Sequence, residues 1–297
     1  MNHFKASLLV LVGAACYGLL STFAKLGYRQ GFGPESITGS QVLFGCLGLW
    51  IISLPLFPKL KELGKRDTAS LLVSGIISGL TGIFYYLSLK MLTASFAVVL
   101  LFQFTWMGLF LEWILYKKKP TQAKWIAILL VLSGSYLASA VQFDSSNLNP
   151  LGIFLGLLAA VTYALFINFS GSVANHLHPL IRSTMMVTGG MIITFIVYPP
   201  KFIINGELAD GLWVWGLLIG LFGSIIPSIL FMIGIPKIGT GLASILASVE
   251  LPVVIIVSAV FLDEKTSLQQ WIGILLILIG IMVSESKAVL WRREWRH

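Results

Sequence analysis

Runs of apolar residues follow one another along almost the whole chain, separated by short polar links. A helix that crosses a bilayer needs about 20 mostly apolar residues, whereas a strand of a membrane barrel needs only about 10 residues with alternating polarity. The runs are long and do not alternate. The pattern therefore predicts an all-α membrane protein with ten transmembrane helices, over residues 6–26, 37–57, 69–89, 93–115, 123–142, 150–172, 180–200, 211–234, 240–262 and 268–287.

The composition supports a protein embedded in lipid. Of the 297 residues, 57% are hydrophobic and only 11% are charged, while soluble domains carry about 25% charged residues. The net charge of +8 arises from short basic clusters between the apolar runs. Such clusters orient helices in a membrane, so we predict no nucleic-acid partner.

The basic residues also predict how the chain crosses the membrane. If the N-terminus lies in the cytoplasm, fifteen of the twenty lysines and arginines fall on the cytoplasmic side, including the cluster at residues 117–119 and Arg182. The opposite side then holds five, among them Lys25 and Lys265. Because cytoplasmic loops carry an excess of basic residues, we predict that both termini are cytoplasmic.

The chain repeats itself at a distance of about half its length. A shift of 146 residues aligns residues 121–135 with 267–281, with seven identities in fifteen positions, among them one tryptophan and one glycine. Five helices per half is an odd number, so the second half must cross the membrane in the opposite sense. We therefore predict two inverted five-helix repeats: residues 1–146, with helices one to five, and residues 147–297, with helices six to ten and a short basic tail. Such repeats, with a site between them, are typical of secondary transporters.

The acidic residue Glu250 lies ten residues into the predicted helix 240–262. At about 1.5 Å per residue it is roughly 15 Å deep, near the middle of a bilayer core about 30 Å thick. A central charged side chain costs roughly 2.5 to 3.5 kcal/mol, so it usually faces a polar cavity. Since burial favours a neutral carboxyl group, Glu250 is a candidate both for substrate binding and for exchanging a proton. The alternative is a protonated glutamate that bonds to a neighbouring helix.

Pro252 predicts a distortion in the same helix. A proline has no N–H, so the carbonyl of Ser248 loses its helical partner and the helix can bend there.

Further polar and aromatic side chains are candidates for the wall of a pathway. Gln103 falls within one position of Glu250 when the halves are overlaid, and Tyr17 aligns with Tyr163. A phenol can both stack on a substrate and hydrogen-bond it, although aromatic residues at helical spacing more often serve packing. The remaining candidates are Tyr85, Tyr86, Trp106, Ser21, Asn168 and Ser228.

Several kinds of chemistry are not expected. Cys16 and Cys46 lie inside apolar runs, where cysteine behaves as a small hydrophobe, and His176 and His178 have no cysteine or acidic companions. The chain has no GxxxxGK motif for ATP. We therefore predict no disulfide, no metal, no cofactor and no catalytic residue.

Glycines spaced four residues apart predict places where helix backbones approach closely. The pairs are Gly75 with Gly79, Gly152 with Gly156, and Gly216 with Gly220.

Several motifs resemble the EamA-type branch of the drug/metabolite transporter superfamily, and together they cover nearly the whole chain. They are Tyr17 and Gly18 with Ser21, Thr22 and Phe23; Pro236 and Lys237; and Glu250 and Pro252 with Trp271, Gly273 and Gly280. The chain departs from the family pattern where Thr105 stands at the position that matches Pro252, and where Gln41 replaces a frequent arginine. The resemblance implies two EamA-like repeats and export of amino acids, metabolites or drugs.

The residues and the resemblance together predict a secondary transporter rather than an enzyme. We expect it to export a small organic solute, an amino acid or related metabolite or a drug-like compound, by alternating access coupled to protons at Glu250. An intramembrane enzyme or flippase for a lipid-linked substrate is the alternative, but it would need clustered acids, histidines or arginines at one face. A scaffold or receptor would not explain the repeat. We expect a monomer or weak homodimer in the cell (plasma or inner) membrane of a bacterium, with the solute, lipid and protons as its partners.

Overall fold

The computed structural model describes the backbone of residues 2–60, 63–89, 91–92, 94–140, 149–262 and 266–294, and all regular elements in these ranges are helical. The first half contains α1 (His3–Arg29), α2 (Pro34–Ser53), α3 (Phe57–Leu60), α4 (Lys65–Leu89), α5 (Ala94–Leu101), α6 (Phe104–Tyr116) and α7 (Gln122–Ala138). The second half contains α8 (Pro150–Ser172), α9 (Pro179–Val197), α10 (Trp213–Gly220), α11 (Ile226–Ile238), α12 (Thr240–Ala247), α13 (Glu250–Leu262) and α14 (Leu268–Glu294).

Nine helical stretches in the described part of the chain are long and apolar enough to cross a membrane. The predicted fifth segment, 123–142, forms α7, a shorter apolar helix of 17 residues. The predicted eighth segment, 211–234, continues through α10, the π-helical turn η5 (Leu221–Ile225) and α11 as far as Ile238. The all-helical membrane fold is thus confirmed. The boundary predicted at residue 146 lies outside the described residues, as does Lys265.

Local sequence explains where several helices begin. The side chain of Thr121 accepts the N–H of Lys124, and that of Asn149 accepts the N–H groups of Leu151 and Gly152. Such caps satisfy backbone donors that have no partner in the first turn. Proline occupies the first turn of α2, α8 and α9, where its missing N–H costs nothing.

Two of the predicted helices are interrupted at matching positions. The segment predicted over 93–115 breaks between α5 and α6, and the segment predicted over 240–262 breaks between α12 and α13. In the second break the carbonyl of Ser248 accepts the N–H of Leu251 at 3.3 Å, which replaces the bond that Pro252 cannot donate. The predicted distortion at Pro252 is therefore confirmed. The first break has no proline; there the hydroxyl of Thr105 donates to the carbonyl of Phe102 at 2.9 Å.

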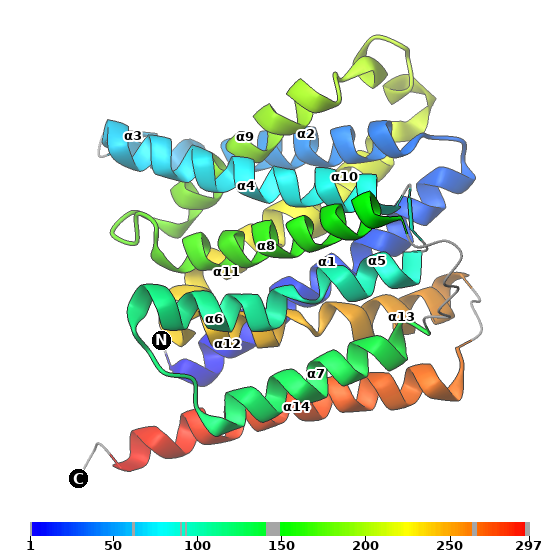
Figure 1. Ribbon diagram of the computed structural model, residues 1–297. Helices are drawn as coiled ribbons and strands as arrows, with labels where there is room; N and C mark the ends of the chain where they lie inside the picture. The colour runs from blue at the N-terminus through cyan, green and yellow to red at the C-terminus, as the bar shows by residue number, and fades with distance from the viewer. Residues whose placement is uncertain are drawn as a thin grey trace.

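The helices of the two halves intermix (Figure 1). α7 and α14 pack along each other on one side of the bundle, α2, α4 and α9 lie on the other side, and α1 passes between them. The start of α1 and the end of α14 lie at the same end of the bundle, which we call the terminal end. α6 also ends there, whereas α13 ends at the opposite end.

The glycine pairs lie where helices of the two halves meet. A Cβ atom at Gly75 would collide with the carbonyl of Met186, and one at Gly220 would lie 2.9 Å from the backbone nitrogen of Gly45. The predicted close packing at these positions is confirmed. Large apolar side chains remain exposed on the outside of the bundle; Ile196, for example, is 70% exposed, as expected for a surface that faces lipid.

Candidate solute-binding site

A cavity of about 370 Å³ lies between the two halves of the bundle. Its walls come from α1, α2, α4 and α5 of the first half, and from α8, α9, η5, α11 and α13 of the second. A volume of this size falls in the range of about 300 to 1,000 Å³ found for sites that hold small molecules. The cavity is therefore the candidate functional site.

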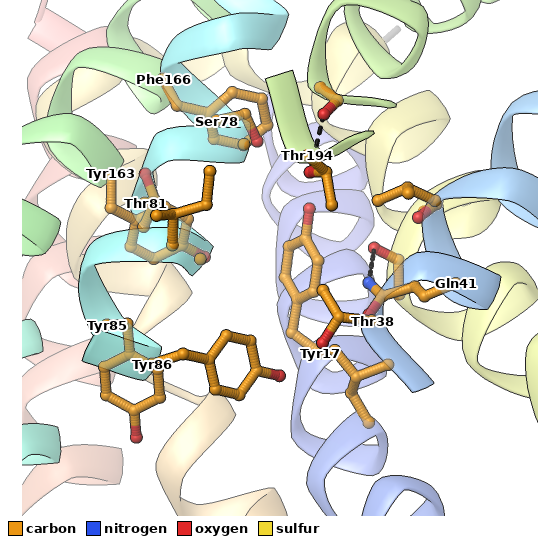
Figure 2. A pocket seen from close by; sticks show the side chains of 18 of the residues that line it. Tyr17, Thr38, Gln41, Ser78, Thr81, Tyr85, Tyr86, Tyr163, Phe166 and Thr194 are labelled. Atoms are coloured by element: carbon orange, nitrogen blue, oxygen red, sulfur yellow. Dashed lines mark hydrogen bonds between the residues drawn. The ribbon is translucent and has the colours of Figure 1, made fainter. Parts of the chain in front are cut away.

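Six of the residues predicted from the sequence line this cavity: Tyr17, Tyr85, Tyr86, Tyr163, Ser228 and Glu250. Figure 2 shows Tyr85, Tyr86 and Tyr163 across the cavity from Tyr17. The structure thus brings together aromatic side chains from α1, α4 and α8 that are far apart in the sequence.

Glu250 occupies the first position of α13, directly after the helix break. Its carboxyl group is half-buried, lies within electrostatic range of the phenols of Tyr17, Tyr85 and Tyr163, and has no hydrogen bond or ion pair with any described residue. Of the described residues that line the cavity, none is an aspartate, lysine, arginine or histidine. Among the described residues of this wall, Glu250 is therefore the only aspartate or glutamate, and the others supply phenols, hydroxyls, one amide and apolar groups.

A close helix contact fixes the position of Glu250. α1 packs against α13, and a Cβ atom at Gly18 would lie 2.7 Å from the Cβ of Val253 and 2.8 Å from the carbonyl oxygen of Glu250. Real side chains do not tolerate such distances, so only glycine allows this approach. Gly18 follows Tyr17 in the sequence. The same turn of α1 therefore places the phenol of Tyr17 in the cavity and the backbone of Gly18 against the break between α12 and α13.

Three of the remaining predicted residues, Gln103, Trp106 and Asn168, do not line the cavity. The amide of Gln103 donates to the carbonyl of Val99 and accepts the indole N–H of Trp106, both at 3.0 Å. Asn168 is buried between helices, where it accepts the hydroxyl of Tyr116 at 3.2 Å and donates to Thr240 at 3.3 Å. The side chain of Ser21 lies outside the described residues. At the two matched breaks, the side chain of Gln103 therefore bonds within its own segment, whereas that of Glu250 faces the cavity.

The sequence reasoning missed several polar groups of the wall. Gln41 donates to the carbonyl of Gly223 at 3.4 Å (Figure 2). Thr81 and Ser78 lie one and two turns before Tyr85, so helical periodicity counted back from Tyr85 would have found them. The other polar residues that were missed are Thr38, Thr194, Tyr198 and Ser224.

The cavity continues toward the end of the bundle opposite the termini. A second cavity of about 570 Å³ shares Thr38, Tyr86 and Tyr198 with the first and is also lined by Glu35 and Glu207. Burial, followed by the nearby Glu35 carboxylate, raises the pKa of the Tyr198 hydroxyl. That hydroxyl therefore stays protonated and can donate a hydrogen bond where the two cavities meet.

The terminal end of the bundle is closed by polar contacts between helices. Glu112 of α6 is buried and pairs with Lys124 of α7 at 2.8 Å. Its carboxylate lies against Gly239 and Gly241, at the start of α12, where a helix N-terminus favours negative charge. Ser53 of α2 bonds to Thr184 of α9 at 2.7 Å. Together with the Asn168 contacts, these interactions connect both halves at the terminal end.

Arg182 corrects one prediction from the charge count. It does not lie in a loop but in the first turns of α9, and its side chain is only 2% exposed. Its guanidinium donates to the carbonyls of Val173 at 3.0 Å, Met232 at 3.1 Å and Ser170 at 2.8 Å. Because α8 ends at Ser172, Arg182 joins the C-terminal carbonyls of α8 to α11, and it does not serve as a loop charge.

A membrane-embedded helical bundle with an internal cavity shared by both halves is the architecture of a transport protein. Comparison with known proteins gives the particular class: the chain belongs to the EamA-like transporter family, whose model matches residues 4–140 and 150–285. The resemblance found in the sequence motifs is thus confirmed.

Individual relatives agree with this assignment. The uncharacterized transporter YwfM of Bacillus subtilis is 26% identical over 176 residues, and the match spans 58% of each chain. An uncharacterized transporter of Archaeoglobus fulgidus is 24% identical over 275 residues, covering 93% of this chain and 94% of the relative. A protein crystal structure matches the whole of both chains with a TM-score of 0.79 at 16% identity, which shows a shared fold.

Proposed function

We propose that this protein is a secondary transporter that exports a small organic solute by alternating access, with the cavity around Glu250 as the substrate site. The observation that carries the proposal is the cavity itself, which lies between the halves, continues toward one end of the bundle and is separated from the other end by polar contacts. A transporter needs a central site that it exposes to one side at a time.

The arrangement of the helices supports two inverted repeats. α6 and α13 end at opposite ends of the bundle (Figure 1), and a shift of 146 places the break after α5 on the break after α12. The contacts between halves also come in matched pairs. In the first half, α4 packs on α8 and α9. The segment that corresponds to α4 in the second half consists of α10 and α11; α10 packs on α2, and α11 packs on α1. Two copies of one unit related by a twofold axis would produce such an exchange.

The proposed cycle follows from this symmetry. With cytoplasmic termini, as the basic clusters predict, the cavity opens to the outside in this structure. The opposite state requires the contacts of Glu112, Asn168 and Thr184 to break and equivalent contacts to form at the other end. Gly75 of α4 contacts the backbone of α9. Such glycine contacts allow the helices to slide, because no side chains interlock there. Glu250 would bind the solute or a proton, and the tyrosines would enclose the solute.

A cavity-blocking variant tests this proposal. Gly82 lines the cavity, and a Cβ atom there would have no neighbour within 4 Å. We expect Gly82→Phe to fill the cavity without destabilising the fold, and therefore to abolish both ligand-induced thermal stabilisation and uptake into proteoliposomes, measured over a panel of amino acids, amines and other metabolites. Leu129→Phe, on the lipid-facing side of α7 where Leu129 is 66% exposed, is the matched control. Equal transport by both variants would contradict the assignment of the cavity.

A further inference from the structure

The formal charges on the described residues that line the two connected cavities all have one sign. Glu250 lines the central cavity, and Glu35 and Glu207 line the outer one. Among the described residues of both walls there is no lysine, arginine or histidine. A cleft lined by charges of one sign attracts ligands of the opposite sign and repels those of its own.

Two of these carboxyl groups have oxygen atoms without a partner among the described residues. The side chain of Glu250 has no hydrogen bond or ion pair with the described residues, and the Oε2 atom of Glu207 is buried without a hydrogen-bond partner among them. A carboxylate removed from water is costly unless it is paired. A positively charged group on the solute would pair with the carboxylate, and a proton would neutralise the carboxylate when the solute is absent.

The aromatic side chains complete the pattern of a cation site. Tyr17, Tyr85, Tyr86, Tyr163 and Phe166 line the same cavity as Glu250. The rings of Tyr85 and Tyr86 are 6.1 Å apart and inclined by 55°, while those of Tyr163 and Phe166 are stacked at 6.2 Å. Aromatic faces attract ammonium groups through their electron-rich π-systems and also bury apolar groups. One carboxylate among several rings therefore suits a cation that carries an apolar body.

We infer that the transported solute is an organic monocation, with one ammonium-type charge that pairs with Glu250 and an apolar or aromatic portion that packs against the tyrosines. This inference rests on the proposed function and adds the substrate class. An anion would meet only like charge on the described residues of the two walls. A zwitterionic amino acid would bring a carboxylate for which the described wall offers no cationic side chain. The outer cavity, with Glu35 and Glu207, attracts the cation before it reaches Glu250.

A series of probes of similar shape and different charge tests the inference. We would measure binding of 2-phenylethylammonium, phenylalanine, 2-phenylethanol and phenylacetate to the purified full-length protein by isothermal titration calorimetry. The expected result is a Kd for the cation at least about tenfold below those of the other three, a difference typical of one well-placed ionic contact. Equal or tighter binding of the alcohol, the amino acid or the anion would overturn the inference, and so would the absence of binding by all four.

Variants assign the effect to Glu250. Glu250→Gln should raise the Kd of the cation about tenfold while leaving that of the alcohol unchanged. Adding Gln41→Glu to this variant moves the carboxylate from α13 to α2 within the same cavity and should recover most of the lost affinity. Glu285→Gln is the matched control, because α14 contributes no described residue to the cavity wall. Unchanged cation binding in Glu250→Gln would overturn the pairing.

The outer cavity has its own test. The double variant Glu35→Gln, Glu207→Gln should lower the association rate of 2-phenylethylammonium several-fold and leave that of 2-phenylethanol unchanged. Equal rates for variant and wild type would overturn the part assigned to the outer cavity.

Failure of the substrate class can be distinguished from failure of the proposed function. If phenylalanine or the alcohol binds best and Gly82→Phe abolishes that binding, the cavity is a solute site and only the cation class falls. If Gly82→Phe leaves the binding of every probe intact, the cavity is not the site and both proposals fall.

Discussion

Glu250 shows how a single residue can be recognised in a membrane sequence and where such recognition ends. Its depth in an apolar segment and the proline two residues later predict a polar site at a helix break, and the structure places it at the break and in a cavity wall. Its expected counterpart, Gln103, instead bonds to Val99 and Trp106 of its own segment. The overlay gives the depth of a side chain, but the direction it faces depends on the rotation of each half-helix.

The first prediction concerns protons. Glu250→Gln keeps the shape of the side chain but removes its proton exchange, so we expect transport in proteoliposomes to lose its dependence on a pH gradient. The titratable groups that face Glu250 are the phenols of Tyr17, Tyr85 and Tyr163, and free phenols titrate only near pH 10. Glu285→Gln should keep the wild-type pH dependence. A pH-driven uptake that survives in Glu250→Gln would remove this residue from the coupling.

The second prediction compares two glycines. Gly18→Ala forces a Cβ atom against Val253 and the carbonyl of Glu250, so we expect a loss of stability of about 1 to 3 kcal/mol, measured as a lower Tm in detergent. Gly82→Ala meets nothing within 4 Å and should leave stability unchanged or raise it by up to about 1 kcal/mol, because alanine favours helix more than glycine does. Similar Tm values for both variants would contradict the close contact between α1 and α13.

At the scale of elements, the two interrupted helices differ in how far the sequence predicts them. Pro252 marks the break between α12 and α13 by chemistry alone, because the missing N–H frees a carbonyl. The break between α5 and α6 has only Thr105 at the matching position, and threonine does not by itself end a helix. Its position follows from the repeat, and its geometry follows from tertiary packing against α8 and α12.

The third prediction addresses the contact among α8, α9 and α11. Arg182→Met leaves the carbonyls of Ser170, Val173 and Met232 without their buried donor, and each hydrogen bond from a charged group is worth about 1.5 to 3 kcal/mol. We expect a loss of at least about 2 kcal/mol in thermal unfolding. Arg182→Lys should also destabilise, since an ammonium group lacks the planar fork.

Arg66→Met is the control for this prediction, because Arg66 is exposed at the start of α4. If Arg182→Met is no less stable than Arg66→Met, the three carbonyl contacts do not hold these helices together.

At the scale of the molecule, the sequence predicts the apolar helices and the two EamA-like repeats, because each of these leaves a local or periodic signal. It does not predict which end of the cavity is open. That property depends on the relative tilt of the two halves, which contacts between distant residues determine, such as Tyr116 with Asn168 and Ser53 with Thr184. Hydroxyl and amide pairs of this kind have no sequence signature, so the closed end became visible only in the structure.

The fourth prediction concerns this closed end. Asn168→Leu has nearly the same volume but loses the bonds to Tyr116 and Thr240, so we expect a larger population of the state that opens toward the terminal end. Trypsin sensitivity of the lysine cluster at residues 117–119, measured from the side of the membrane that holds the termini, should increase. Leu129→Phe, on the lipid-facing side of α7, should leave it at the wild-type level. Identical digestion of all three proteins would show that the Asn168 contacts do not hold this end closed.

The central claim, that one cavity between inverted halves is exposed alternately to the two sides, can be tested by the reactivity of a single thiol. Gly82→Cys would be made in a background with Cys16→Ala and Cys46→Ala, both of which remove buried native cysteines, and labelled with a membrane-impermeant maleimide in right-side-out and inside-out vesicles. We predict that the introduced thiol reacts from the side opposite the termini and that Asn168→Leu shifts the reaction toward the terminal side. Labelling from neither side, or an unchanged sidedness in Asn168→Leu, would contradict it.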